Sequence, residues 1–123
     1  MSHTFKYLRC PVLVLRIAEA QVSGDTVADS LRDELLQVYE QSGATHVVID
    51  MGQVTYLSSA GLRPLLALNK HTHLREGRLV LCNLQSDVEG VFLATRLIST
   101  SGATPATFEK HRNVAEAVAS LYA

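Results

Sequence analysis

The sequence lacks the features that mark several large classes of protein. Its 123 residues include no tryptophan, two cysteines and three prolines, and 11 Lys and Arg are balanced by 12 Asp and Glu. A net charge of −1 gives no overall positive field that would attract nucleic acid or an anionic membrane. The longest apolar runs, such as Pro11–Leu15 and Leu65–Leu68, reach about five residues, far below the roughly 20 that span a bilayer. We therefore predict neither a nucleic-acid partner nor a membrane span.

The few cysteines also carry information about the compartment. Cys10 and Cys82 form no C-x-x-C pair and no zinc-binding pattern with histidine. Such usage is typical of a reducing compartment in which thiols stay free. The apolar run that follows Lys6 and Arg9 is too short for a secretory signal and has no small-residue cleavage pattern after it. We therefore expect a cytoplasmic protein.

Motifs that signal catalysis, nucleotide binding or metal binding are missing as well. The seven glycines are scattered and build neither G-x-G-x-x-G nor a P-loop. Neither Ser58 nor Ser59 stands in the G-x-S-x-G sequence of a serine hydrolase. His71 and His73 are two positions apart, so a helix would point them in different directions and they could not share a metal. The sequence predicts no cofactor, no metal and no enzymatic activity.

The organisation is that of one compact domain over residues 1–123. The chain is 47% hydrophobic, and no linker-like or repetitive segment interrupts it. The apolar spacing predicts strands at Phe5–Arg9, Val12–Ile17, Val47–Ile49, Arg78–Cys82 and Thr104–Phe108. It predicts helices at Thr26–Ser42, Ala60–Leu74, Ser86–Ile98 and Val114–Tyr122. Strands alternate with helices after the first pair, so the fold class is α/β with at least part of its sheet parallel.

Two of the predicted helices begin with a capping-box signature, a hydroxyl residue three positions before an acid. These are Thr26 before Asp29 and Ser86 before Glu89. The continuously apolar strand Val47–Ile49 is typical of a central strand covered on both faces. The turn after it therefore lies at the carboxyl end of a central strand, where open α/β sheets place their sites. At that strand end, Asp50 could orient the loop that leads to Ser59 or simply cap a turn.

Pro64 leaves the beginning of the second predicted helix open. If the helix begins at Ala60, the missing N–H of Pro64 cancels an intrahelical hydrogen bond. Either the first turn is distorted, or regular helix begins near Arg63 with Pro64 at the favoured first position.

The segment VVIDMGQVTYLSSAGL, residues 47–62, resembles the STAS domain family, whose bacterial members include the anti-sigma-factor antagonists. The family pattern is an acid-terminated apolar strand, an apolar pair, and then Asp-Ser-Ser/Thr-Gly-Leu. The similarity extends over nearly the whole chain, through the basic-Leu-Val-Leu strand at Arg78–Leu81, the helix opening at Ser86 and the final amphipathic helix. It implies a STAS-like fold with a mixed, partly parallel sheet of about five strands flanked by about four helices.

The resemblance also implies a functional site. Aligning Gly61 and Leu62 with the family pattern places the phosphoacceptor hydroxyl at Ser59. Ser58 stands where the family has Asp, and Ala60 stands where it has a second hydroxyl. The implied partner-binding residues are Ser58, Gly61, Leu62 and Arg63.

By the same resemblance, the protein binds an anti-sigma factor or serine kinase of the histidine-kinase-like ATPase fold, and phosphorylation of Ser59 switches the binding. A PP2C-type phosphatase would reverse the modification, and ATP and Mg²⁺ would belong to the kinase. The alternative is a constitutive STAS adaptor or structural subunit, for example of a transport complex. Ser59 would then only cap a helix, a role that stabilises a helix by about 1 kcal/mol.

Overall fold

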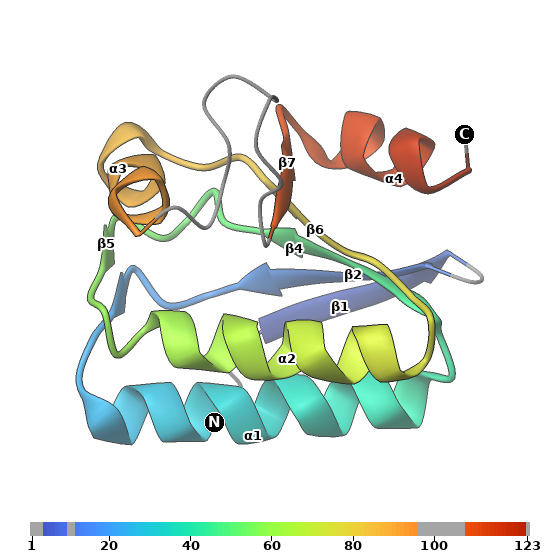
Figure 1. Ribbon diagram of the computed structural model, residues 1–123, viewed down its shortest axis with the longest axis horizontal. Helices are drawn as coiled ribbons and strands as arrows, with labels where there is room; N and C mark the ends of the chain where they lie inside the picture. Colours follow the sequence, from blue (N-terminus) through green and yellow to red (C-terminus); the bar gives the residue numbers. More distant parts are fainter. Residues whose placement is uncertain (1–3, 10–11, 96–107, 123) are drawn as a thin grey trace.

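The computed structural model describes residues 4–9, 12–95 and 108–122 of the chain. A central sheet has the strand order β1-β2-β4-β6-β7 (Figure 1). Its members are β1 (Thr4–Arg9), β2 (Val12–Ile17), β4 (His46–Asp50), β6 (Leu79–Cys82) and β7 (Glu109–His111). The β1–β2 pair is antiparallel and the other three pairs are parallel. The predicted mixed, partly parallel sheet of five strands is therefore confirmed.

Helices cover both faces of this sheet. They are α1 (Asp25–Ser42), α2 (Leu62–Leu74), α3 (Ser86–Ala94) and α4 (Val114–Tyr122). Figure 1 shows α1 and α2 side by side below the sheet and α4 above it. None of these described helices combines the length and the apolar character that crossing a membrane requires.

The sheet has a hydrophobic core on each of its two faces. The strands contribute to both cores because successive side chains of a strand point to opposite faces. In β4, Val47 and Ile49 pack with α1, α2 and α3, whereas Val48 packs with Ala117 of α4. All three β4 side chains are fully buried. The continuous apolar run thus marks a strand covered on both faces, as its sequence predicted.

A second, smaller sheet lies beside the carboxyl ends of the main strands. It pairs β3 (Gln21–Val22) with β5 (Tyr56–Leu57) in parallel. The sequence pattern did not predict it, because two residues cannot show the alternation by which a strand is recognised. This small sheet positions the candidate site.

Both capping boxes predicted from the sequence are wrong. Helix α1 begins at Asp25 after Gly24, whose φ of 79° lies in the left-handed region that favours glycine. Thr26 is therefore inside the first turn and not before it. Helix α3 begins at Ser86, its N-cap is Gln85, and no side chain caps it.

The chain after α3 differs in part from the prediction. The last described strand of the sheet is Glu109–His111, and Phe108, the final residue of the predicted strand, lies just before it. Phe108 instead is buried against Phe92 of α3, with the ring planes perpendicular and the ring centres 5.8 Å apart. Residues 104–107 of the predicted strand, and residues 96–98 of the predicted third helix, lie outside the described residues.

Candidate functional site

The candidate site is the turn between β5 and α2. Three backbone hydrogen bonds wind it, from the N–H of Gly61, Leu62 and Arg63 to the carbonyl three residues earlier in each case, at 3.0, 3.2 and 3.2 Å. Bonds of this spacing are typical of the tight turn that often precedes an α-helix. The turn therefore runs directly into α2.

Pro64 fits this arrangement without loss of a hydrogen bond. Regular helix begins at Leu62, so Pro64 is the third residue of α2. The first four N–H groups of a helix have no intrahelical partner, and the missing N–H of Pro64 is one of these. Of the two alternatives left open by the sequence, the later helix start is correct. The helix begins at Leu62, one residue before the expected Arg63.

The two serines of the turn have different surroundings. Ser58 is half-buried, and its hydroxyl oxygen accepts a hydrogen bond from the Gly61 N–H at 3.2 Å. Ser59 is exposed, and its hydroxyl has no hydrogen-bond partner among the described residues. Ser58 therefore caps the turn, whereas α2 itself has Gly61 as its N-cap and no capping side chain. The Ser59 hydroxyl is accessible from solvent.

Gly61 is fixed by close packing against the small sheet. A Cβ atom at this position would lie 2.5 Å from the Val22 carbonyl oxygen and 2.7 Å from a methyl carbon of Leu57. The same Val22 carbonyl accepts a hydrogen bond from the Ser58 N–H at 3.0 Å. The site turn therefore packs against β3, and Gly61 is buried in this contact.

Leu62 is not a surface residue, contrary to the expectation from sequence. Only 5% of it is exposed, and it belongs to the main core cluster. As the first residue of α2 it points toward α1 and the sheet, so it is not available for direct contact with a partner.

Arg63 is exposed and forms an ion pair that the sequence analysis did not anticipate. One of its terminal nitrogens lies 2.5 Å from a carboxylate oxygen of Asp25, the first residue of α1. Its Nε also lies 3.4 Å from the Ala60 carbonyl oxygen. Asp25 and Arg63 are 38 positions apart in the chain, and only the packing of α1 against α2 reveals the pair.

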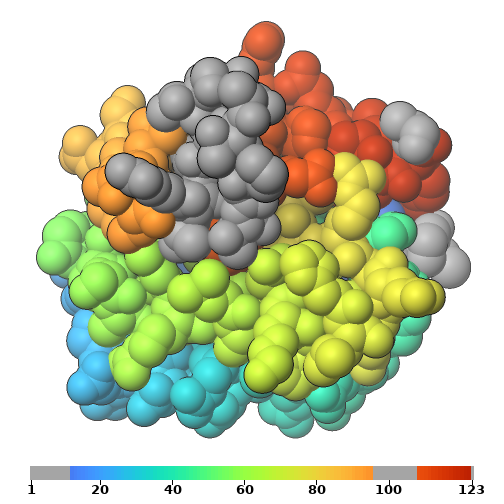
Figure 2. All heavy atoms as spheres, viewed as in Figure 1, coloured from blue at the N-terminus to red at the C-terminus, as the bar shows by residue number. Residues whose placement is uncertain are grey.

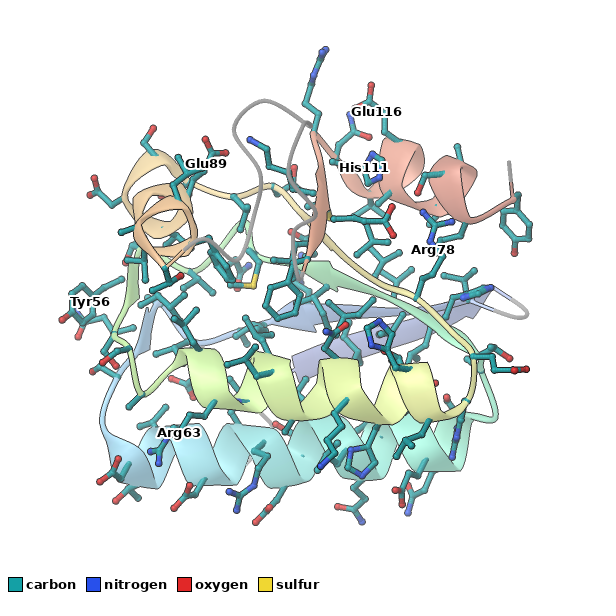
Figure 3. The ribbon with its side chains drawn as sticks, in the orientation of Figure 1. Tyr56, Arg63, Arg78, Glu89, His111 and Glu116 are labelled. Atoms are coloured by element: carbon teal, nitrogen blue, oxygen red, sulfur yellow. The ribbon has the colours of Figure 1, made fainter. Side chains whose placement is uncertain are left out.

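Tyr56 is the second neighbour that sequence reasoning missed. It is 54% exposed, because successive residues of a strand point to opposite faces and the next residue, Leu57, is the one that points into the core. Figure 3 shows Tyr56 and Arg63 at the same end of the molecule, on β5 and at the beginning of α2. The alternation of Tyr56 with the buried Leu57 could have predicted that Tyr56 is exposed, but only if β5 had been recognised as a strand.

Asp50 supports the loop that leads to the site but does not reach the serines. Its Oδ1 accepts hydrogen bonds from the Gly52 N–H at 2.9 Å and from the Asn83 side chain at 3.0 Å. Gln85 completes the link with a bond to the Gly52 carbonyl at 2.7 Å. Of its two predicted roles, Asp50 therefore has that of a turn cap, and it also ties the ends of β4 and β6 together.

Other titratable groups lie away from this turn. Burial raises the pKa of the Cys82 thiol to about 12, with a smaller contribution from Asp50. His71 lies on α2, with one ring nitrogen 3.0 Å from the Ala67 carbonyl oxygen, and His73 is exposed. Within the described ranges, no three His, Cys, Asp or Glu side chains gather as a metal site would require.

The family model for the STAS domain matches residues 11–115. The chain belongs to the STAS domain family. A protein of Bordetella bronchiseptica named "Putative anti-sigma factor antagonist BtrV" is 39% identical over 72 residues. That alignment covers 58% of this chain and 61% of the Bordetella protein.

Solved structures share the same fold. A "putative anti-sigma factor antagonist" of Thermotoga maritima superposes with a TM-score of 0.79 at 13% identity, over 98% of this chain and 95% of that one. The phosphorylated form of the Bacillus cell fate determinant SpoIIAA superposes with a TM-score of 0.65 at 14% identity, over 95% of this chain and 97% of the SpoIIAA chain. The murine anion transporter Slc26a9 matches 91% of this STAS domain with 18% of its own chain, at 12% identity and a TM-score of 0.70.

Proposed function

We propose that this STAS domain is a non-catalytic regulator of the anti-sigma-factor-antagonist type, switched by phosphorylation of Ser59. It binds an anti-sigma factor or related serine kinase of the histidine-kinase-like ATPase fold, and the modified form is released. A PP2C-type phosphatase restores the binding form. ATP and Mg²⁺ are bound by the kinase, so the domain needs no cofactor.

The observation that carries the proposal is the contrast between the two serines. A kinase needs a hydroxyl that it can reach, and the Ser59 hydroxyl is exposed and unpartnered among the described residues, whereas Ser58 is engaged with Gly61. The turn precedes α2, and the dipole of a helix favours negative charge near its N-terminus. A phosphate at Ser59 therefore need not unfold the domain.

Two findings support the regulatory class. The Bordetella relative is named as an anti-sigma factor antagonist, and SpoIIAA has been solved in a phosphorylated form with the same fold. Tyr56 beside the turn offers the kind of exposed aromatic side chain that often anchors a protein interface. A phosphate of charge about −1.5 to −2 next to such an anchor resists the desolvation that binding requires.

The first test is the site of modification. A partner is recovered by pull-down and incubated with the protein, ATP and Mg²⁺, and the product is analysed by intact-mass and fragment spectra. We expect one phosphate, on Ser59, and none on the Ser59→Ala variant. A phosphate confined to Ser58, or no phosphate from a kinase shown to bind, would refute the switch.

The second test is binding by calorimetric titration. Ser59→Asp should bind the partner at least tenfold more weakly than the unmodified protein, a difference of about 1.4 kcal/mol. Ser59→Ala should bind normally but no longer be released by ATP. Ser58→Ala is the matched control for loss of a hydroxyl from the same turn.

A constitutive adaptor is the second candidate, and the similarity to a segment of the Slc26a9 anion transporter favours it. An adaptor would bind its partner equally well as the Ser, Ala and Asp forms at position 59. Binding would then depend on exposed apolar side chains, and Tyr56→Ala would weaken it while substitutions of Ser59 would not. The same titration therefore separates the two functions.

A further inference from the structure

Arg63 lies where its guanidinium can pair with either of two anions, the Asp25 carboxylate or a phosphate on Ser59. Its guanidinium reaches Asp25 at 2.5 Å across the gap between two helices, and its Nε lies 3.4 Å from the carbonyl of Ala60, the residue next to Ser59. Figure 3 shows the Arg63 side chain between the beginning of α2 and α1, and Figure 2 shows these two segments adjoining at the surface. The guanidinium therefore lies over the site turn and not away from it.

Ser59 and Arg63 are four residues apart on a continuously wound segment. The N–H groups of Leu62 and Arg63 bond back to the carbonyls of Ser59 and Ala60, which folds the chain between Ser59 and Arg63 into a tight turn. Within this turn the Arg63 Nε lies 3.4 Å from the carbonyl oxygen of Ala60, so the guanidinium is placed one residue from Ser59. Phosphate oxygens on Ser59 would thus come within reach of the guanidinium by side-chain rotation alone.

The pair with Asp25 is weak enough to be exchanged. The Arg63 and Asp25 side chains are 52% and 83% exposed, and exposed ion pairs contribute little because water and salt screen them. A phosphate has more charge than a carboxylate and can accept two parallel N–H bonds from one guanidinium. The more highly charged anion therefore wins the competition.

From this geometry we infer that Arg63 leaves Asp25 and becomes the counter-ion of phosphorylated Ser59. The inference rests on the proposed function for the natural source of the phosphate. Modification would then have two effects on the surface, since it adds a phosphate and also uncovers the Asp25 carboxylate. Asp25 stands in the first turn of α1, where a negative charge is favourable, so α1 stays folded without its partner. In this role Arg63 positions the phosphate and helps to define the released state.

The experiment installs phosphoserine at position 59 during translation, so that no kinase is needed. Titration followed by ³¹P nuclear magnetic resonance gives the second pKa of the phosphate, which is ordinarily about 6. An adjacent guanidinium favours the dianion, so this pKa should be lower than in the Arg63→Gln variant by about 0.3 or more. Lys70→Gln removes an exposed positive charge about 10 Å further along α2 and is the matched control, expected to leave the pKa unchanged.

Asp25→Asn identifies which anion holds Arg63. If the exchange occurs, Arg63→Gln raises the phosphate pKa by a similar amount with Asp25 present and with Asp25→Asn. If Arg63→Gln has an effect only in the Asp25→Asn protein, Asp25 retains the guanidinium and the inference is wrong. An equal pKa with and without Arg63 in both proteins would also overturn it. A kinase that fails to modify Ser59 would refute the proposed function but would leave these pKa values untouched.

Discussion

Gly61→Ala is the substitution whose effect follows most directly from the structure. The backbone at Gly61 has φ of −66° and ψ of −16°, which alanine adopts readily, so backbone strain does not enter. The added Cβ would lie 2.5 Å from the Val22 carbonyl oxygen and 2.7 Å from a Leu57 methyl carbon. The Leu57 side chain could rotate, but the Val22 carbonyl is fixed by its bond from the Ser58 N–H. The turn must therefore move away from β3.

The magnitude has two opposing parts. Forcing a methyl group into a packed site costs about 1–3 kcal/mol, and distortion of the Ser58 to Val22 hydrogen bond adds to that cost. Replacing glycine by alanine also restricts the unfolded chain, which returns about 0.4–1 kcal/mol. We expect a net loss of about 2 kcal/mol in the free energy of unfolding.

Urea denaturation followed by circular dichroism measures this loss, as a fall of about 1 M in the midpoint. Gly90→Ala is the matched control, because Gly90 lies within α3 and a Cβ there meets nothing within 4 Å. That variant should gain about 0.5–1 kcal/mol, the usual advantage of alanine over glycine in a helix. If Gly61→Ala were as stable as the unmodified protein, the close packing of the site turn on β3 would be refuted.

Three further outcomes follow from the described contacts. Ser58→Ala should lower the unfolding free energy by about 1 kcal/mol in a urea melt, whereas Ser59→Ala should change it by less than about 0.5 kcal/mol, and equal losses would contradict their different roles. The hydrogen bond from Arg78 lowers the pKa of Glu109, so the contribution of this carboxylate is complete above its unfolded value of about 4.3 and is lost as the pH falls through the lower folded value. Melts between pH 2 and 7 should therefore show the stability difference between the unmodified protein and Glu109→Gln shrinking below about pH 4, and a constant difference would exclude the effect. Burial raises the pKa of Cys82 to about 12, so in an otherwise cysteine-free background its thiol should react with a disulfide reagent at pH 8 only after urea is added.

The large elements of the fold could be predicted because each repeats its signal over several residues. β4 and β6 are apolar runs buried on both faces, and α4 shows the helical spacing of Val114, Ala117, Val118 and Leu121. These patterns report burial, and burial is what the strands and helices of a layered α/β fold share. The class and the composition of the sheet followed from them.

The details of the site could not be obtained in the same way. The start of α1 depends on the positive φ of Gly24, and a nearby Thr26 imitated a cap. Leu62 and Arg63 are neighbours in sequence, yet one is buried and the other pairs with Asp25. Only the three-dimensional packing of α1, α2 and β3 decides these contacts, and no local pattern contains them.

Under the proposed function, the bond between the Ser58 N–H and the Val22 carbonyl has a consequence for when Ser59 becomes a kinase substrate. It joins positions 36 residues apart, so it forms only when the entropy cost of closing that long loop has been overcome. A short peptide covering residues 52–66 lacks the Val22 carbonyl and cannot hold the turn in this shape. A kinase that reads the shape of the turn would therefore act on the completed fold and ignore nascent or unfolded chains, so that the modification itself reports folding.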